Sequence, residues 1–328
     1  MKPKRFLLLH ILLILFIAGL LLSLLKGPVP TTFRDLWNFL LRHDSTHAVI
    51  FIDLRLTRAL LAFLVGASLS LSGAILQGYF QNPMAGPFVV GVSSGASLGA
   101  VLSIYLGLSM QVLAFSLQSI FAFVSGFVLV SIVYLLSQKK GIFKVETLLL
   151  TGIAAGALAS SLTSFFIFLK SESFEQAVFW LLGSFALADR SQIFAVLPYF
   201  LICFLVAQFL AKDMNLLALG DETAQSLGCS VNRVRKIFLV LSTLLAASAV
   251  SVSGIIGFIG LVVPHWVRIL IGPDHRYLFF FSSLAGGVFL IYSDLLARTL
   301  LFPTELPIGI ITAGIGAPFF IYLLYQRK

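Results

Sequence analysis

Charged residues are scarce in this chain of 328 residues: Asp, Glu, Lys and Arg make up 11% of it, against about 25% in an ordinary soluble domain. A water-soluble fold would have too little polar surface at this composition. Cysteine is scarce too, since only Cys203 and Cys229 occur, and their separation fits neither a metal-ligand spacing nor a disulfide framework. We therefore expect no redox chemistry and no metal site.

Motifs for ATP binding and for metal-dependent hydrolysis are also missing. No glycine is followed by lysine, which excludes the phosphate-binding loop Gly-x-x-x-x-Gly-Lys-Ser/Thr, and His-Glu-x-x-His does not occur. We expect this chain to be no enzyme and to carry no cofactor of its own. An intramembrane enzyme would need a catalytic constellation, which the sequence does not offer.

Long apolar blocks dominate the chain, of which 59% is hydrophobic. About 20 residues of helix cross the roughly 30 Å hydrocarbon core of a bilayer, whereas a β-barrel would show short alternating segments. We predict an all-α, polytopic membrane protein whose residues 1–328 form a single domain. Its first span is too long for a signal peptide. The ten predicted spans lie near 6–25, 56–77, 89–107, 112–136, 146–168, 192–211, 236–254, 256–271, 277–297 and 308–325.

Basic residues indicate the orientation of these spans. With both termini inside, the cytoplasmic side collects fourteen of the 22 Lys and Arg residues, which favours this topology. The net charge of +9 comes from residues scattered over loops without a nucleic-acid-binding motif, so topology explains it better than nucleic acid. The fourteen are Lys2, Lys4, Arg5, Lys139, Lys140, Lys144, Lys212, Arg233, Arg235, Lys236, Arg268, Arg276, Arg327 and Lys328.

Three polar segments are too long or too patterned to be simple turns: 26–55 and 169–191 outside, and 212–235 inside. The second contains 174–180, which predicts a short interfacial helix with aromatic anchors. The third has apolar residues at helical spacing, interrupted by Gly220 and Gly228. It predicts two short cytoplasmic helices over about 214–231 that offer an apolar docking surface to another protein.

Repeated glycines and one irregular segment form two further patterns. Glycines at 91, 95, 99, 152 and 156 recur every four residues, which favours close helix packing. The segment 81–87, with Asn82, Pro83 and Pro87, must break the helical pattern. It is either a cytoplasmic turn or irregular backbone that lines a water-filled path.

Ionisable residues near the span ends also leave alternatives. Arg55, Arg58 and Arg298 lie at the outer side, against the positive-inside tendency, so they indicate an acidic partner. Snorkelling, or for Arg298 an i,i+4 pair with Asp294, is the alternative. His265 in the eighth span has no ligand companions and is interpreted as a packing or hydrogen-bonding histidine.

At these residues the sequence resembles the FecCD-type permeases, the membrane subunits of type II ABC importers for iron-siderophores and vitamin B12. The similar segments follow one another in family order from residue 54 to the C-terminus. Thr57, Gly86 and the pair Val145-Glu146 depart from the family pattern, which has proline, an acidic residue and small polar residues there. The similar segments are 54–58, 65–74, 82–87, 91–96, 216–228, 257–265 and 305–309.

The resemblance implies a homodimer with the translocation path on its axis, two ATP-binding cassette subunits that bind ATP and Mg²⁺, and a periplasmic or lipoprotein substrate-binding protein. It places the chain in the bacterial inner membrane. Arg55, Arg58 and Arg298 would dock the binding protein, and Asn82, Met84, Val145 and Glu146 would narrow the inner gate. The residues implied to couple to the ATPase are Leu219, Gly220, Asp221, Glu222, Ala224, Leu227 and Gly228.

The expected function is therefore that of an importer permease for a metal chelate, with iron-siderophore first, cobalamin and haem next, and oxyanions such as molybdate behind them. An ion-coupled secondary transporter is the alternative. It should show paired broken helices and acidic residues at mid-membrane, and the sequence shows no charge clearly at a helix centre.

Overall fold

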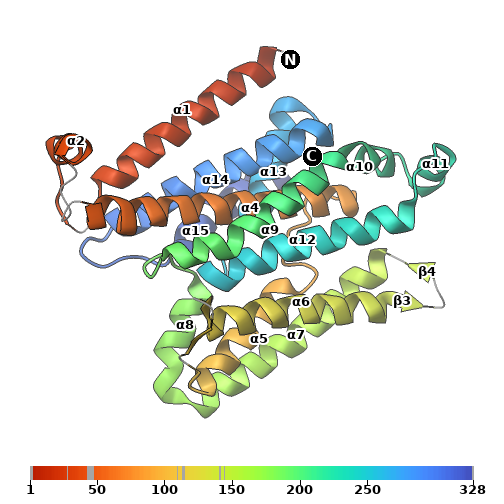
Figure 1. Ribbon diagram of the computed structural model, residues 1–328. Coiled ribbons are helices and arrows are strands. Elements are labelled where there is room, and N and C mark those ends of the chain that lie inside the picture. Colours follow the sequence, from red (N-terminus) through yellow and green to blue (C-terminus); the bar gives the residue numbers. More distant parts are fainter. Residues whose placement is uncertain are drawn as a thin grey trace.

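The computed structural model describes residues 3–27, 29–42, 48–108, 110–112, 115–139, 142–143 and 145–326, and helices dominate it (Figure 1). Lys2, Lys140, Lys144, Arg327 and Lys328, which the charge count placed inside, lie outside these residues. The longer helices are α1 (Pro3–Leu25), α2 (Phe33–Arg42), α4 (Thr57–Tyr79), α5 (Val92–Tyr105), α6 (Leu117–Ser137), α7 (Val145–Leu169), α9 (Arg190–Phe209), α12 (Val231–Ser253), α13 (Ile259–Ile271), α14 (His275–Thr299) and α15 (Ile308–Gln326).

Short elements connect these helices. The π-helix η1 (Val49–Leu56) leads directly into α4, and the 3₁₀ turn η2 (Ser171–Ser173) leads into α8 (Phe174–Leu182). Two-residue strands pair as β1 (Gln111–Val112) with β2 (Phe115–Ser116), and as β3 (Gln138–Lys139) with β4 (Ile142–Phe143). The helices α10 (Ala211–Leu217) and α11 (Asp221–Ser226) form a separate pair between α9 and α12.

The predicted all-α membrane fold is confirmed. Within the described residues, seven helices are long and apolar enough to cross a membrane, and three shorter apolar helices accompany them. Each of the ten predicted spans coincides with one of these helices. The largest offsets are at α6 and α12, which begin at Leu117 and Val231 instead of the predicted 112 and 236. The predicted interfacial helix is α8, and the two short helices of the inner segment are α10 and α11.

The centre of the bundle is α4, which packs most extensively on α14 and next on α12. Small residues let these backbones approach without intervening side chains. Gly66 lies against the Gly286 carbonyl, and Gly73 lies against the Gly260 carbonyl of α13. The buried Ser72 hydroxyl donates to the Ser242 carbonyl of α12 at 2.8 Å. As a result α4 has no face left for lipid or for another protein.

The repeated glycines pack α5 against its neighbours, as the spacing predicts. A Cβ on Gly95 would lie 2.7 Å from the Ser125 carbonyl oxygen of α6, and Gly99 contacts the Phe121 carbonyl. On the other side, Gly152 of α7 lies against Val89 and Val90. These contacts fix α6 and α7 around α5.

Two of the helices span only part of a bilayer. The 14 residues of α5 and the 13 of α13 cover about 21 and about 20 Å at 1.5 Å per residue. Each follows an irregular segment, 80–91 before α5 and 254–258 before α13. Irregular backbone at membrane depth is tolerated where protein buries it, and Ala85, Gly86 and Pro87 are buried.

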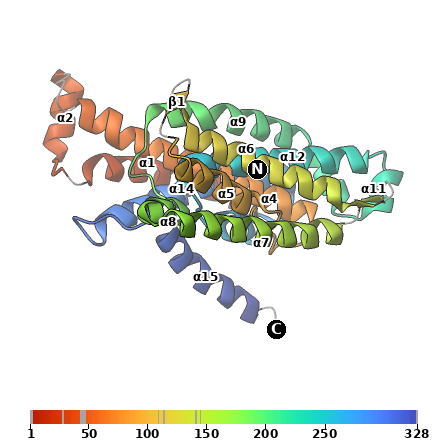
Figure 2. The same ribbon diagram turned by 90° about the horizontal axis from the view of Figure 1, so that it is seen from below.

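The two ends of the bundle differ. We call the end that carries α10 and α11 the inner end, and the opposite end, with η1 and α8, the outer end (Figure 1). The start of α1 lies at the inner end, because the Arg5 guanidinium sits 3.7 Å from the centre of the Tyr277 ring. Figure 2 shows that α15 diverges from the rest of the bundle. Its contacts within the chain are with α14, α13 and α8.

Candidate functional site

The three outer arginines lie close together in the structure, but each is used within the chain. Arg55, at the end of η1, is 4% exposed and donates hydrogen bonds to the carbonyls of Leu24 and Val29 and to the Thr31 hydroxyl. These acceptors belong to the end of α1 and the segment after it. Arg55 therefore joins η1 to the outer end of α1.

Arg58 lies one turn further along, at the start of α4, between two carboxylates. Its Nε is 3.0 Å and its Nη2 2.8 Å from Asp294 Oδ1, and its Nη1 is 3.0 Å from Glu305 Oε2. The side chain of Asp294 is 2% exposed and that of Glu305 is 26% exposed. Arg58 thus connects α4, α14 and the loop that leads into α15.

Arg298 completes this cluster. Its Nε is 3.6 Å from Asp294 Oδ2, which is the i,i+4 pair expected from the sequence, and its Nη2 donates to the Ser23 hydroxyl at 2.5 Å. Arg58 and Arg298 share the two carboxylates and Arg55 contacts neither, so the three arginines and two acids leave an excess positive charge. The acidic partner that the arginines indicate is present in the chain itself. Their docking to a second protein stays a prediction, and it requires these groups to change partners.

The inner segment predicted to couple to an ATPase is presented beyond the helix bundle by α10 and α11 (Figure 1). Gly220 and Gly228 have φ of 98° and 85°, which glycine adopts without strain, and they separate α11 from α10 and α12. Leu219 is 60% and Leu227 57% exposed, whereas Ala224 is fully buried. Leu219 and Leu227 thus leave apolar side chains available to another protein.

Four hydrogen bonds anchor this segment to the bundle. Arg235 of α12 donates to Asp221 at 2.8 Å, and the Gln81 side chain donates to the Leu217 carbonyl at 2.6 Å. The Asn215 side chain donates to Asp274 at 2.8 Å, and its carbonyl oxygen accepts the His275 backbone N–H at 2.9 Å. Asn215 therefore joins α10 to the first turn of α14.

The sequence does not predict this junction. The helix α13 ends at Ile271, and Asp274 is the N-cap of α14. The hydrogen bond from the Arg276 side chain, together with the one from Asn215, holds the pKa of Asp274 below the ordinary value of an aspartate. An ionised carboxylate at this position is stabilised by the helix dipole as well.

The predicted gate residues lie in two places near the inner end. Asn82 and Met84 are in the turn between α4 and α5, where the Asn82 side chain accepts the Met84 backbone N–H at 2.9 Å. Glu146 is exposed in the first turn of α7, directly after Val145. Among the described contacts, no hydrogen bond or ion pair joins the two groups. A gate formed from both stays a prediction.

The sequence also contains a hydrolase-like motif that was not considered above. Gly91 to Gly95 has the spacing Gly-x-Ser-x-Gly of a hydrolase nucleophile elbow, which joins a strand to a helix. Here the irregular segment 80–91 precedes α5, and the Ser93 carbonyl accepts the Ser97 hydroxyl at 2.8 Å. The motif is therefore interpreted as helix packing. Among the described residues, no three His, Cys, Asp or Glu side chains gather as metal ligands.

Comparison with known proteins finds relatives that align with most or nearly all of this chain. A cobalamin import system permease protein from Halobacterium salinarum is 43% identical over 87% of this chain and 75% of its own length. The hemin transport system permease protein of Yersinia pestis is 38% identical over 98% of this chain and 96% of its own length.

Solved structures show the same fold. An inward-facing structure assigned to the metal-chelate type of ABC transporter superposes with a TM-score of 0.87 at 33% identity, over 98% of this chain and 99% of its own. The family model of the FecCD transport family matches residues 13–326. This chain, with its buried arginine cluster and its projecting inner helices, belongs to the FecCD transport family.

Proposed function

We propose that this chain is the permease subunit of a bacterial inner-membrane ABC importer that translocates a metal chelate, powered by a separate ATPase. Iron-siderophore is the first candidate substrate, and cobalamin or haem is next. The observation that carries the proposal is the projecting pair α10 and α11, whose exposed Leu219 and Leu227 offer a docking surface at the inner end.

A homodimer fits the apolar surface that the chain leaves uncovered. Exposed residues include Ile153 and Leu158 on α7 and Ile310 and Ile321 on α15, and α15 has few contacts within its own chain. A closed two-fold dimer would pair these faces with their own copies. The path for the chelate would then run between the two copies, with the Asn82 turn and Glu146 at its inner end.

The ion-coupled secondary transporter is the second candidate. The half-length helices α5 and α13 are a feature that this class shares. However, the buried carboxylate Asp294 lies in the outer arginine cluster, where Arg58 and Arg298 already neutralise it. An ATPase and a binding protein remain the partners that the family relatives favour.

The experiment that tests the proposal is uptake into liposomes that contain this chain and the neighbouring ATPase, with the binding protein added. Ferric siderophores, cobalamin, haem and molybdate are compared. Uptake that requires ATP and both partners supports the importer and identifies its substrate. Uptake driven by an ion gradient without ATP supports the secondary transporter instead.

Docking at α10 and α11 has its own test with a matched control. Leu219→Asp introduces a charge at an exposed apolar position, and we expect it to reduce co-purification of the ATPase. Leu301, which is 59% exposed at the outer end against 60% for Leu219, provides the control as Leu301→Asp. Equal ATPase recovery with both variants would count against this surface.

A further inference from the structure

A two-chamber cavity lies between α6 and α9 near the outer end, with α12 as its floor. The outer chamber has a volume of about 530 Å³ and the inner chamber about 410 Å³. Ser119, Ser251 and Val252 line both, so the chambers adjoin. Each volume falls within the range of small-molecule sites.

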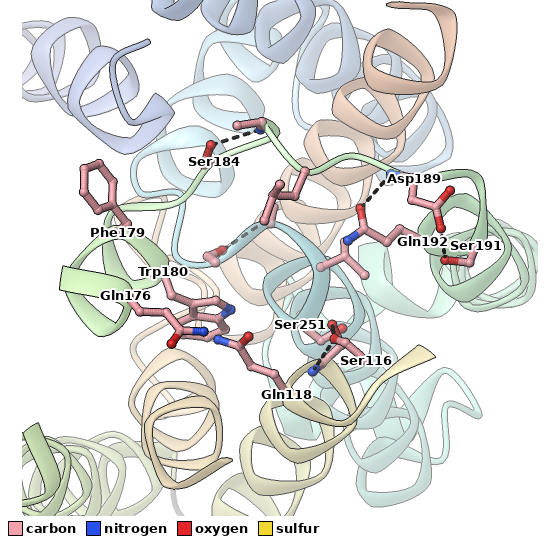
Figure 3. Close-up of a pocket in the computed structure, with 16 residues that line it drawn as sticks. Ser116, Gln118, Gln176, Phe179, Trp180, Ser184, Asp189, Ser191, Gln192 and Ser251 are labelled. Atoms are coloured by element: carbon pink, nitrogen blue, oxygen red, sulfur yellow. Dashed lines mark hydrogen bonds between the residues drawn. The ribbon is translucent and has the colours of Figure 1, made fainter. Parts of the chain in front are cut away.

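The two chambers differ in polarity. Gln118, Gln176 and Gln192 line the outer one together with several serines, and Figure 3 shows their amides around the opening. Within the described residues, no hydrogen bond engages the side-chain amides of Gln118 or Gln176. The inner chamber is lined mainly by apolar and aromatic side chains, among them Phe123, Phe194 and Pro198. A ligand that fills both needs a polar head and an apolar tail.

The cavity opens on an exposed, apolar face of the chain. The walls α6 and α9 bury only 22% and 17% of their apolar windows, against 89% for η1 with α4. Val124 of α6 is 49% exposed, and Phe194 and Ile202 of α9 are 68% and 61% exposed. Figure 1 shows α12 between these two helices. The inner chamber is therefore open on the apolar side of the bundle, where a hydrocarbon chain could enter it.

The charge of the outer chamber indicates the kind of headgroup. Asp189 is the only Asp, Glu, Lys or Arg among the residues that line either chamber, and Arg190 beside it turns to Asp53. Hydrogen bonds from the Ser191 hydroxyl and the Arg190 backbone N–H lower the pKa of Asp189, so its carboxylate is ionised at neutral pH. Figure 3 shows Trp180 across the chamber from Asp189.

We propose that the two chambers form a site for one phospholipid with a zwitterionic, ammonium-bearing headgroup, with the headgroup in the outer chamber and an acyl chain in the inner one. The ammonium group lies beside the Asp189 carboxylate, and the amides and hydroxyls of the rim donate to the phosphate. Anionic lipids are disfavoured, because the carboxylate repels them and no lining Lys or Arg compensates.

Trp180 provides the signal for the test, because bromine atoms on a lipid chain quench tryptophan fluorescence. The chain has 3 tryptophans, so Trp37→Phe and Trp266→Phe leave Trp180 alone. This full-length variant is placed in vesicles of equal amounts of phosphatidylethanolamine and phosphatidylglycerol. In the first sample phosphatidylethanolamine carries bromine near the glycerol end of its acyl chain, and in the second sample phosphatidylglycerol does. The ratio of the two lipids is the same in both samples.

We expect brominated phosphatidylethanolamine to occupy the site about 1.4 to 5 times more often than brominated phosphatidylglycerol. Asp189→Asn, which keeps a helix-capping side chain, should bring this ratio close to one. Ala195→Phe should fill the inner chamber and remove the saturable part of the quenching. Leu201→Phe, at an exposed position on the same helix, is the control and should leave the ratio unchanged.

Equal quenching by both lipids, or stronger quenching by phosphatidylglycerol, would overturn the proposal. Quenching by neither lipid would also overturn it, because it would mean that protein, such as a second copy of the chain, covers the cavity. A preference unchanged in Asp189→Asn would refute the headgroup assignment. The quenching experiment requires neither transport nor ATP hydrolysis, so its result is independent of the proposed function.

Discussion

The partner exchange required of Arg58 leads to a quantitative prediction. If Arg58 leaves Glu305 to reach a carboxylate on a binding protein, Glu305 competes with that protein. Glu305 is 26% exposed, and an ion pair at such a position contributes about 0.2–1 kcal/mol. Since about 1.4 kcal/mol corresponds to a tenfold change in affinity, Glu305→Gln should tighten docking by about 1.4- to 5-fold.

The buried partner of Arg58 should behave differently. Asp294 has a 2% exposed side chain and contacts both Arg58 and Arg298. Its replacement by Asn leaves the buried Arg298 guanidinium without a countercharge and Arg58 with Glu305 alone, and removing one partner of a buried pair costs about 3–5 kcal/mol. We therefore expect Asp294→Asn to destabilise the chain, measured as a lower unfolding temperature in detergent.

Docking is measured as binding of the substrate-binding protein to the permease complex in lipid nanodiscs at two salt concentrations. Asp53→Asn serves as the control, because the Asp53–Arg190 ion pair is exposed and lies outside the cluster. Weaker docking in Arg58→Gln without tighter docking in Glu305→Gln would refute the exchange but keep the docking role. Unchanged docking in Arg58→Gln would refute the docking role itself.

Three further predictions concern the packing and the inner end. Gly73→Ala places a methyl group against the Gly260 carbonyl and should abolish folded protein in size-exclusion chromatography, whereas Gly314→Ala, with nothing within 4 Å, should not. Asn215→Leu removes the hydrogen bonds that Asn215 makes with Asp274 and His275, a loss of about 1–3 kcal/mol, and should uncouple ATP hydrolysis from uptake while the ATPase still co-purifies; the exposed Asn232→Leu is its control. Because the pKa of Asp274 is depressed, its contribution is present above the unfolded-state pKa and lost only as the pH falls through the lower folded-state value, so ATPase co-purification should not vary between pH 5 and 8.

The helices could be predicted because apolar run length alone specifies a membrane span. The side-chain contacts between the helices could not be predicted. Arg58 and Asp294 are 236 residues apart, and nothing local indicates that both point to the same site. Asn215 has no signal in the sequence either, because a polar residue in a polar loop is ordinary until the fold brings the start of α14 beside it. The offset at α12 arises because its first turn, from Val231 to Arg235, is polar and extends beyond the apolar run.

The backbone contacts of α4 have a mechanical consequence. Where Gly66 meets Gly286 and Gly73 meets Gly260, no side chain lies between the main chains, so no rotamer change can bring them closer or let them slide. The unit of α4, α13 and α14 therefore moves as one rigid body. Any alternation of shape during a working cycle has to come from helices outside this unit, among them α15, which diverges from the rest of the bundle.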